Sequence, residues 1–370
     1  MIIKNANVFM EDGSFIKKDI YINGERFTEN ESGDEAVIDA EGLYAIPGLT
    51  DIHFHGCVGY DFCDGTHEAT EAIAVYEAAN GITSMAPATM TLGDEELTRI
   101  FSNAGTYENR NGASLVGINM EGPYLSYAKK GAQNPAFLRV SDLEHFHKMQ
   151  KLSNGLIKMV AIAPEEEGAM DFIKAAKDEV VLSVAHTTAD YAKASEAFEN
   201  GASHVTHLYN AMPPFTHRES GVIGAAFDAP HAHVELICDG VHISPPVVRA
   251  TFKLFGDDRV ILISDSMMAT GMADGTYSLG GQAVNVKGNL ATLADGTIAG
   301  SATNLFKCMT IAVSFGIPLE SAVKCAAVNP AKEIGIYDEY GSITPGKYAN
   351  VVLMDKDLNL KQVVLKGKAL

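Results

Sequence analysis

The stretch Thr50–Gly56, TDIHFHG, places two histidines one residue apart at the end of an apolar run, and a glycine follows them directly. Successive side chains of a β-strand point to opposite faces, so His53 and His55 share a face and can both reach one metal ion, at about 2.1 Å each. An isolated His-x-His pair is more often a packing feature than a metal site. Its meaning therefore depends on what the rest of the chain places around it.

Seven further segments share the apolar, β-rich character of the first. The eight runs are LTDIHFH, ITSMAPAT, SLVGINMEGP, LIKMVAIAP, VVLSVAH, ASHVTHL, HVELICDG and VILISDS. Segments with the apolar spacing of helices lie between them, and several begin with Ser, Thr or Asp as a candidate N-cap. Eight strand-then-helix units predict an α/β fold, a (β/α)8 TIM-type barrel whose functional groups stand at the carboxyl ends of the strands. A doubly wound open sheet is the alternative, and the count of eight favours the closed barrel.

Short alternating segments occupy both ends of the chain, for example MIIKNANVF and DIYINGERF at the start and ANVVLMD and LKQVVLKG at the end. Isolated hairpins are marginally stable, so we expect the two ends to pair in one small β-sandwich domain. The predicted division is residues 1–49 plus 336–370 for this β domain and residues 50–335 for the barrel.

The charge balance restricts the partners. The formal net charge is −19, with 47 acidic against 28 basic residues, which argues against nucleic acid or an anionic membrane as a partner. The N-terminus lacks the apolar core of a secretory signal, and no apolar segment approaches the ~20 residues that span a bilayer. Five scattered cysteines, an odd number, fit reduced thiols better than disulfides. We therefore expect a cytoplasmic protein that binds neither nucleic acid nor membrane.

Metal-ligand side chains end five of the eight runs. They are His53, His55, Glu121, His186, His207 and Asp265. Each one alone has a structural explanation as a helix cap, a turn former or a core histidine. Together, at one rim of a barrel, they predict a site for one or two divalent metal ions. Imidazole and carboxylate ligands suit zinc, which we favour, and also iron, manganese or cobalt.

A second His-x-His pair, His231 and His233 in PHAHVEL, begins a predicted strand instead of ending one. The amino ends of barrel strands form the structural rim, so we expect this pair to lie opposite the metal site.

Several longer motifs run through nearly the whole chain: PGLTDIHFHG, MEGPYLS, KKGAQNP, VAHTTAD, THLYNAMPPF, CDGVH, ISDSM and the tail GSITPGKYANVVLMD. On these motifs the sequence resembles the amidohydrolase superfamily and, within it, the family of N-acetylglucosamine-6-phosphate deacetylases. The resemblance implies a metal-dependent hydrolase that converts N-acetylglucosamine 6-phosphate to glucosamine 6-phosphate and acetate. It also implies that Glu121, His186 and His207 hold the principal ion, and that His53 and His55 hold a second ion bridged by Glu121. The carboxylated lysine that ends strand 4 in many other amidohydrolases has no counterpart, because run 4 ends in AIAPEEE.

Asp265 is the expected catalytic residue as well as a metal ligand. We expect its carboxylate to orient a water molecule, accept its proton and pass that proton to the departing amine, because an amine is a poor leaving group until it is protonated. Gln133 in KKGAQNP stands where some relatives carry a histidine that binds the acyl oxygen. A glutamine can donate a hydrogen bond there but carries no charge.

For the substrate phosphate, the resemblance points to Asn210, Ala211, Arg218 and His242. Backbone N–H groups and a guanidinium group suit phosphate oxygens. In related enzymes the arginine of the THRESG motif reaches the neighbouring subunit's site, which implies a homodimer. Two alternatives stay open. The substrate could be a related amino-sugar phosphate such as N-acetylgalactosamine 6-phosphate, or the chain could be an inactive barrel that serves as a binding or assembly protein.

Overall fold

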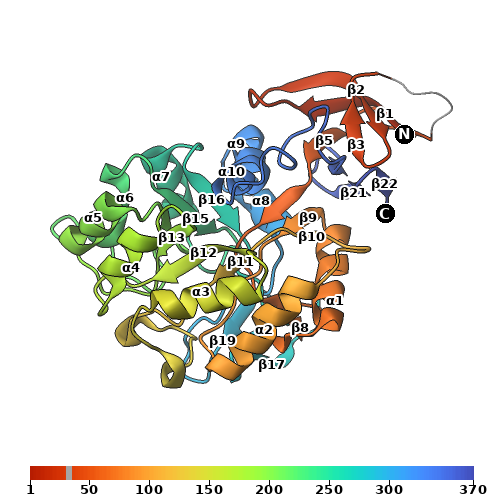
Figure 1. Ribbon diagram of the computed structural model, residues 1–370. Helices are drawn as coiled ribbons and strands as arrows, with labels where there is room; N and C mark the ends of the chain where they lie inside the picture. Colours follow the sequence, from red (N-terminus) through yellow and green to blue (C-terminus); the bar gives the residue numbers. More distant parts are fainter. Residues whose placement is uncertain (31–35) are drawn as a thin grey trace.

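The computed structural model describes residues 1–30 and 36–370, which form a parallel β-barrel ringed by helices and a separate sheet that holds both chain ends (Figure 1). The barrel strands are β6 (Leu49–Asp51), β9 (Ile82–Met85), β10 (Ser114–Leu115), β11 (Ile118–Met120), β12 (Ile157–Ile162), β13 (Val181–Val184), β14 (His204–Val205), β15 (His233–Ile237) and β16 (Val260–Ile263). They coincide with the eight predicted runs, the third run supplying both β10 and β11. The predicted barrel class is confirmed.

The barrel is closed. Strands β6, β9 and β10 pair in parallel, as do β11 to β16 in sequence order. A parallel bridge between Ala88 and Asn119 connects the two sheets. Between the last and first strands, the backbone N–H of Asp265 donates to the carbonyl of His53 at 2.9 Å. These links exclude the open, doubly wound sheet.

A helix follows each of the eight strand runs, and after β16 a three-stranded excursion comes before it. The helices are α1 (His67–Ala79), α2 (Asp94–Thr106), α3 (Leu143–Leu152), α4 (Ala169–Ala176), α5 (Tyr191–Asn200), α6 (Gly221–Asp228), α7 (Pro245–Phe255) and α8 (Leu305–Ser314), and α9 (Leu319–Val323) and α10 (Asn329–Glu333) come after them. The N-caps that the sequence indicates are formed at Thr66, Asp142 and Asp190, whose side chains accept backbone N–H groups of the first turn. No helix in residues 1–30 or 36–370 combines the length and apolar character needed to cross a bilayer.

The barrel strands are continuous apolar runs because they are buried on both faces. In β16, Val260 and Leu262 pack into the large core under the helices, whereas Ile261 and Ile263 join a smaller cluster with Ile237. Alternate side chains of one strand therefore fill two different cores. The residues of these strands include few Asp, Glu, Lys or Arg, namely Asp51 in β6, Lys158 in β12 and Glu235 in β15.

The separate sheet contains strands from both ends of the chain. They are β1 (Ile2–Phe9), β2 (Phe15–Asn23), β3 (Arg26–Thr28), β4 (Val37–Asp39), β5 (Tyr44–Pro47), β20 (Val351–Met354), β21 (Leu360–Leu365) and β22 (Lys368–Ala369). Hydrogen bonds join them as one branched sheet, because the first half of β1 pairs with β4 and its second half with β5. The sheet encloses a core of its own, which includes Ile3, Val8 and Leu353.

Three further strands extend from the carboxyl rim of the barrel. They are β17 (Gly275–Leu279), β18 (Gln282–Lys287) and β19 (Leu290–Thr292), which form an antiparallel sheet, while the short pair β7 (Gly56–Cys57) and β8 (Tyr60–Asp61) follows the first barrel strand. All five cysteines are free thiols, in agreement with the expectation from their number and spacing.

Candidate active site

The six ligand-type residues converge at the carboxyl end of the barrel. His53 and His55 follow β6, Glu121 follows β11, His186 follows β13, His207 follows β14 and Asp265 follows β16. They form two groups of three, Glu121, His186 and His207 in one and His53, His55 and Asp265 in the other, and within each group the donor atoms lie within 4.8 Å of one another. All six residues are buried.

The geometry of the Glu121 group fits a metal ion. The Oε1 atom of Glu121 lies 2.9 Å from Nε2 of His186 and 3.3 Å from Nε2 of His207, and the two imidazole nitrogens are 3.1 Å apart. Two ligands at ~2.1 Å from a tetrahedral ion are separated by about 3.4 Å. The Nδ1 atom of His186 faces the carbonyl of Lys129 at 2.8 Å. Because a carbonyl only accepts, Nδ1 carries the hydrogen and Nε2 offers its lone pair to the group.

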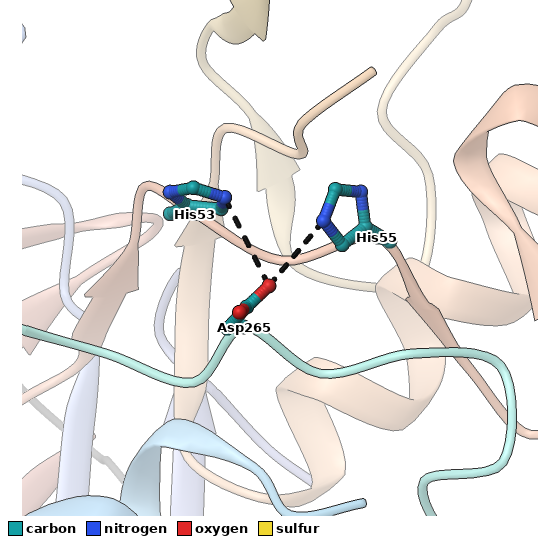
Figure 2. Close-up of side chains that lie close together, drawn as sticks. All are labelled: His53, His55 and Asp265. Atoms are coloured by element: carbon teal, nitrogen blue, oxygen red, sulfur yellow. Dashed lines mark ion pairs between the residues drawn. The ribbon is translucent and has the colours of Figure 1, made fainter. Parts of the chain in front are cut away.

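The second group faces the first across the pocket floor. Figure 2 shows the rings of His53 and His55 directed at the carboxylate of Asp265, whose Oδ1 atom lies 3.9 Å from Nε2 of His53 and 3.3 Å from Nε2 of His55. The buried Nε2 of His53 has no hydrogen-bond partner among the described residues. A buried polar nitrogen left in this way is costly, so the group is suited to receive a cation.

Glu121 belongs to the first group and also lies close to the second. Its Oε1 atom lies 3.6 Å from Nε2 of His53, and its Oε2 atom lies 3.4 Å from Nε2 of His55. The amide of Gln133 donates to Oε2 of Glu121 at 2.9 Å and accepts the backbone N–H of Thr91 at 2.7 Å. The structure thus places Gln133 beside the site, with its amide holding the shared carboxylate.

The backbone turns sharply where three of these residues leave their strands. His186, His207 and Asp265 have φ values of 43°, 29° and 50°, in the left-handed region that non-glycine residues rarely adopt. Such conformations cost about 1–3 kcal/mol each and cluster at functional sites. They occur where the three side chains enter the two donor groups, His186 and His207 in one and Asp265 in the other.

The charges of the site favour ionised carboxylates. Burial alone would raise the pKa of Glu121, but the imidazoles of His53, His186 and His207 outweigh burial and hold that pKa well below its usual range. Burial also opposes ionisation of Asp265, yet the neighbouring His55 and His53 lower its pKa. An ionised Asp265 can accept a proton.

A pocket opens above the two groups. Its lining includes four of the residues expected to bind substrate: Gln133, Asn210, Ala211 and His242. The fifth, Arg218, is exposed and is not among the described residues that line this pocket. The pocket also takes in residues that sequence reasoning did not single out, namely Met90, Lys129, Ala132, Leu279, Thr297 and Ile298.

His242 is fixed by Asp239. Its Nδ1 atom lies 2.7 Å from Oδ2 of Asp239, and Oδ1 of the same carboxylate accepts the backbone N–H groups of Val241 and His242. Burial alone would lower the pKa of His242, but Asp239 raises it. Asp239 therefore fixes the orientation of the His242 ring and favours its positively charged form beside the pocket.

Comparison with known proteins places this site in a family. Residues 44–370 match the family model described as the amidohydrolase family. The chain belongs to the amidohydrolase family. The membership inferred from the sequence motifs is confirmed.

Three similar amidohydrolases have informative names. N-acetylglucosamine-6-phosphate deacetylase of Bacillus subtilis (strain 168) is 38% identical over 99% of this chain and 93% of its own length. N-acetylgalactosamine-6-phosphate deacetylase of Escherichia coli O157:H7 is 32% identical over 89% of this chain and 88% of its own length. A mutant N-acetyl-D-glucosamine-6-phosphate deacetylase of Mycobacterium smegmatis, solved in complex with N-acetyl-D-glucosamine-6-phosphate, superposes with a TM-score of 0.92 at 32% identity, covering 100% of this chain and 98% of that one.

Sequence reasoning missed Glu235 in this amidohydrolase barrel. It lies in the middle of β15, is fully buried and contacts Nδ1 of His53 at 2.8 Å. The signal that could have found it is the one carboxylate within the strand segment HVELI of the run HVELICDG. Among the other pocket residues, Lys129 and Ala132 lie in the KKGAQNP motif. Met90, Thr297 and Ile298 lie outside the named helices and strands, Leu279 ends β17, and these four carry no comparable signal.

Proposed function

We propose that this amidohydrolase removes the acetyl group from N-acetylglucosamine 6-phosphate to give glucosamine 6-phosphate and acetate. The observation that carries the proposal is the two adjacent three-residue donor groups, with Glu121 of the first also close to His53 and His55 of the second, beneath a pocket that His242 also lines. The printed names of the Bacillus and Mycobacterium relatives support this substrate. An inactive barrel is disfavoured because all six ligand-type residues are present and converge.

The principal ion would be held by Glu121, His186 and His207. A second ion would be held by His53, His55 and Asp265, and Glu121 lies close to both positions. A divalent ion bound there lowers the pKa of a water ligand from ~15.7 toward ~7 and polarises the acetyl carbonyl. The imidazole and carboxylate donors suit zinc, which we favour, and also iron, manganese or cobalt.

Asp265 would move the proton. Its carboxylate accepts a proton from the water that attacks the acetyl carbon, and then donates that proton to the amine nitrogen as the C–N bond breaks. Transfer by such a positioned group contributes about 10²- to 10⁴-fold to the rate.

His242 and the Asn210–Ala211 turn would bind the phosphate at the pocket wall. Arg218 is exposed and outside the pocket, so we infer that it serves a second copy of the chain, as in a homodimer. A guanidinium group and an imidazolium group both form charge-assisted hydrogen bonds with phosphate oxygens.

Acetate release from phosphorylated and unphosphorylated N-acetylglucosamine tests the proposal, with metal content measured on the same preparation. Charge-assisted hydrogen bonds contribute about 1.5–3 kcal/mol each, so two of them predict a kcat/KM for the phosphorylated sugar about 10²- to 10⁴-fold higher. Equal kcat/KM values for the two sugars would contradict the phosphate assignment. Metal-free protein that still releases acetate would contradict the hydrolytic mechanism.

The galactosamine epimer is the second candidate substrate, because the Escherichia coli relative is named for it. The two substrates differ in the orientation of one ring hydroxyl, which the placement of the metal ligands does not distinguish. The ratio of kcat/KM for the two 6-phosphates decides between them, and a ratio above one for the galactosamine epimer would replace the leading substrate.

Replacing His242 with glutamine is expected to raise KM for the phosphorylated sugar by about 10- to 100-fold, because a hydrogen bond to a charged group is lost. Turnover of the unphosphorylated sugar should be unaffected. The matched control is His231→Gln, an exposed histidine beside the opposite rim. An unchanged KM in His242→Gln would remove His242 from the phosphate site.

A further inference from the structure

A line of alternating imidazoles and carboxylates runs behind the metal-ligand groups. Nδ1 of His53 lies 2.8 Å from Oε2 of Glu235, whose Oε1 lies 3.2 Å from Nε2 of His204. Nδ1 of His204 lies 2.8 Å from Oε1 of Glu333. Oε2 of Glu333 in turn lies 2.7 Å from Nδ1 of His233. The first four side chains are buried, and that of His233 is 34% exposed. His233 begins β15, so the line reaches the opposite rim, where the sequence placed this histidine.

One oxygen of Glu235 links the two ligand groups. Its Oε2 atom accepts from Nδ1 of His53 at 2.8 Å and from the backbone N–H of His207 at 2.9 Å. His53 belongs to one three-residue group and His207 to the other. Displacement of this single carboxylate would therefore release a ligand ring and the backbone of a strand end together.

The hydrogen bond to Glu235 also determines the tautomer of His53. An ionised carboxylate only accepts, so Nδ1 of His53 carries the hydrogen, and in the neutral ring that a metal ion requires, the lone pair is on Nε2. That Nε2 atom is the one that lies 3.6 Å from Glu121 and 3.9 Å from Asp265 without a hydrogen-bond partner among the described residues. The ring therefore presents a metal-binding lone pair at the place where the other donors converge.

His204 and Glu333 support the buried charge of Glu235. The 3.2 Å contact between His204 and Glu235 lacks the alignment of a hydrogen bond and acts through charge. Burial alone would lower the pKa of His204, but Glu235 and Glu333 raise it to about 9. A positive His204 between two carboxylates compensates for burying them in an otherwise apolar barrel.

We propose that Glu235 is a positioning residue of the metal centre, which holds His53 in its Nδ1-protonated form and thereby secures the ion bound by His53, His55 and Asp265. The inference rests on the proposed two-ion site. Carboxylates that orient metal-binding histidines in this way typically change metal affinity by about 10- to 100-fold when they are replaced.

Metal titration of metal-free protein with Zn²⁺ tests the inference without reference to catalysis. Glu235→Gln keeps the size of the side chain and an acceptor oxygen but loses the charge, whereas Glu235→Leu removes the acceptor. We expect the affinity for the second ion to fall by about 10-fold in the glutamine variant and about 100-fold in the leucine variant. The affinity for the first ion and the thermal midpoint of the metal-free glutamine variant should stay close to those of the wild type.

The matched control is Glu77→Gln. Glu77 is equally buried, lies in α1, and neither of its oxygens has a hydrogen-bond partner among the described residues. Burial raises the pKa of Glu77 well above its usual range and so favours the uncharged acid, which glutamine resembles in size and charge. Both ions should bind the Glu77→Gln protein with wild-type affinity.

The outcomes separate the inference from the proposed function. Unchanged second-ion affinity in Glu235→Gln overturns the inference and leaves the deacetylase proposal standing. An equal loss of both ions with a lowered thermal midpoint in Glu235→Gln, or a comparable loss in Glu77→Gln, also overturns it, because the role would then be general stability. If the wild-type chain binds one ion only, the inference about Glu235 is overturned, but a deacetylase that uses one metal ion is still possible. If it binds no ion, both the inference and the proposed metal-dependent deacetylase are overturned. If Glu235→Leu fails to fold, the glutamine variant alone decides.

Discussion

Asp265→Asn is expected to lower kcat for N-acetylglucosamine 6-phosphate by about 10²- to 10⁴-fold. Asparagine has nearly the same size and keeps one oxygen near Nε2 of His55, which lies 3.3 Å from Oδ1 in the native protein. The neutral amide cannot accept the proton of water or return it to the leaving amine. KM should change little, because Asp265 lies on the pocket floor with the metal-ligand groups, whereas the proposed phosphate contacts come from other residues.

Metal analysis of the same variant separates proton transfer from metal binding. The Glu121 group is unaltered in Asp265→Asn, so the principal ion should remain bound. Asp171→Asn, which changes an exposed aspartate of α4, provides the matched control and should retain wild-type kcat. An Asp265→Asn protein with wild-type kcat would show that another group carries the proton.

His186→Ala is expected to lose the principal ion and to reduce kcat/KM by about 10³-fold or more. The substitution removes one of three donors and leaves only Glu121 and His207, whose closest donor atoms are 3.3 Å apart. Loss of the ion removes several kcal/mol of charge stabilisation in the transition state, and about 4 kcal/mol corresponds to 10³-fold. Mass-spectrometric metal content and steady-state kinetics on one preparation measure both effects.

His147→Ala is the control for the loss of a histidine. Its side chain is 45% exposed on α3 and pairs with Glu179, away from the pocket lining. Full activity and metal content are expected. A His186→Ala protein that retained both would contradict the ligand assignment, whereas parallel losses in His147→Ala would point to a nonspecific effect on folding.

The barrel was predictable because its signal is local. Each strand is buried on both faces, so it reads as an unbroken apolar run, and each run ends where the chain reaches the polar rim. The count of runs and the residues that end them were therefore visible without contacts. His53, Glu121 and Asp265 were expected to lie close together because they end predicted strands, since parallel strands bring their carboxyl ends to one rim.

The branched pairing of the terminal sheet was not predictable in the same way. Alternation of polar and apolar residues indicates strands but not their neighbours, and β1 divides its edge between β4 and β5. The pairing of β5 with β20 joins segments about 300 residues apart in the sequence, and no local pattern specifies such a partner.

The sequence by itself determined the fold class, the strand ends and the kinds of side chain that stand at the rim, because burial periodicity and residue chemistry are properties of short segments. Only the tertiary structure decided which donor atoms meet: that Glu121 faces both groups, that Gln133 holds Glu121 and that Arg218 lies outside the pocket of its own chain. The link from Glu235 to His53 spans 182 residues. Side-chain contacts of this kind depend on strand register and rotamer across the barrel, and these are set by the packing of the whole chain.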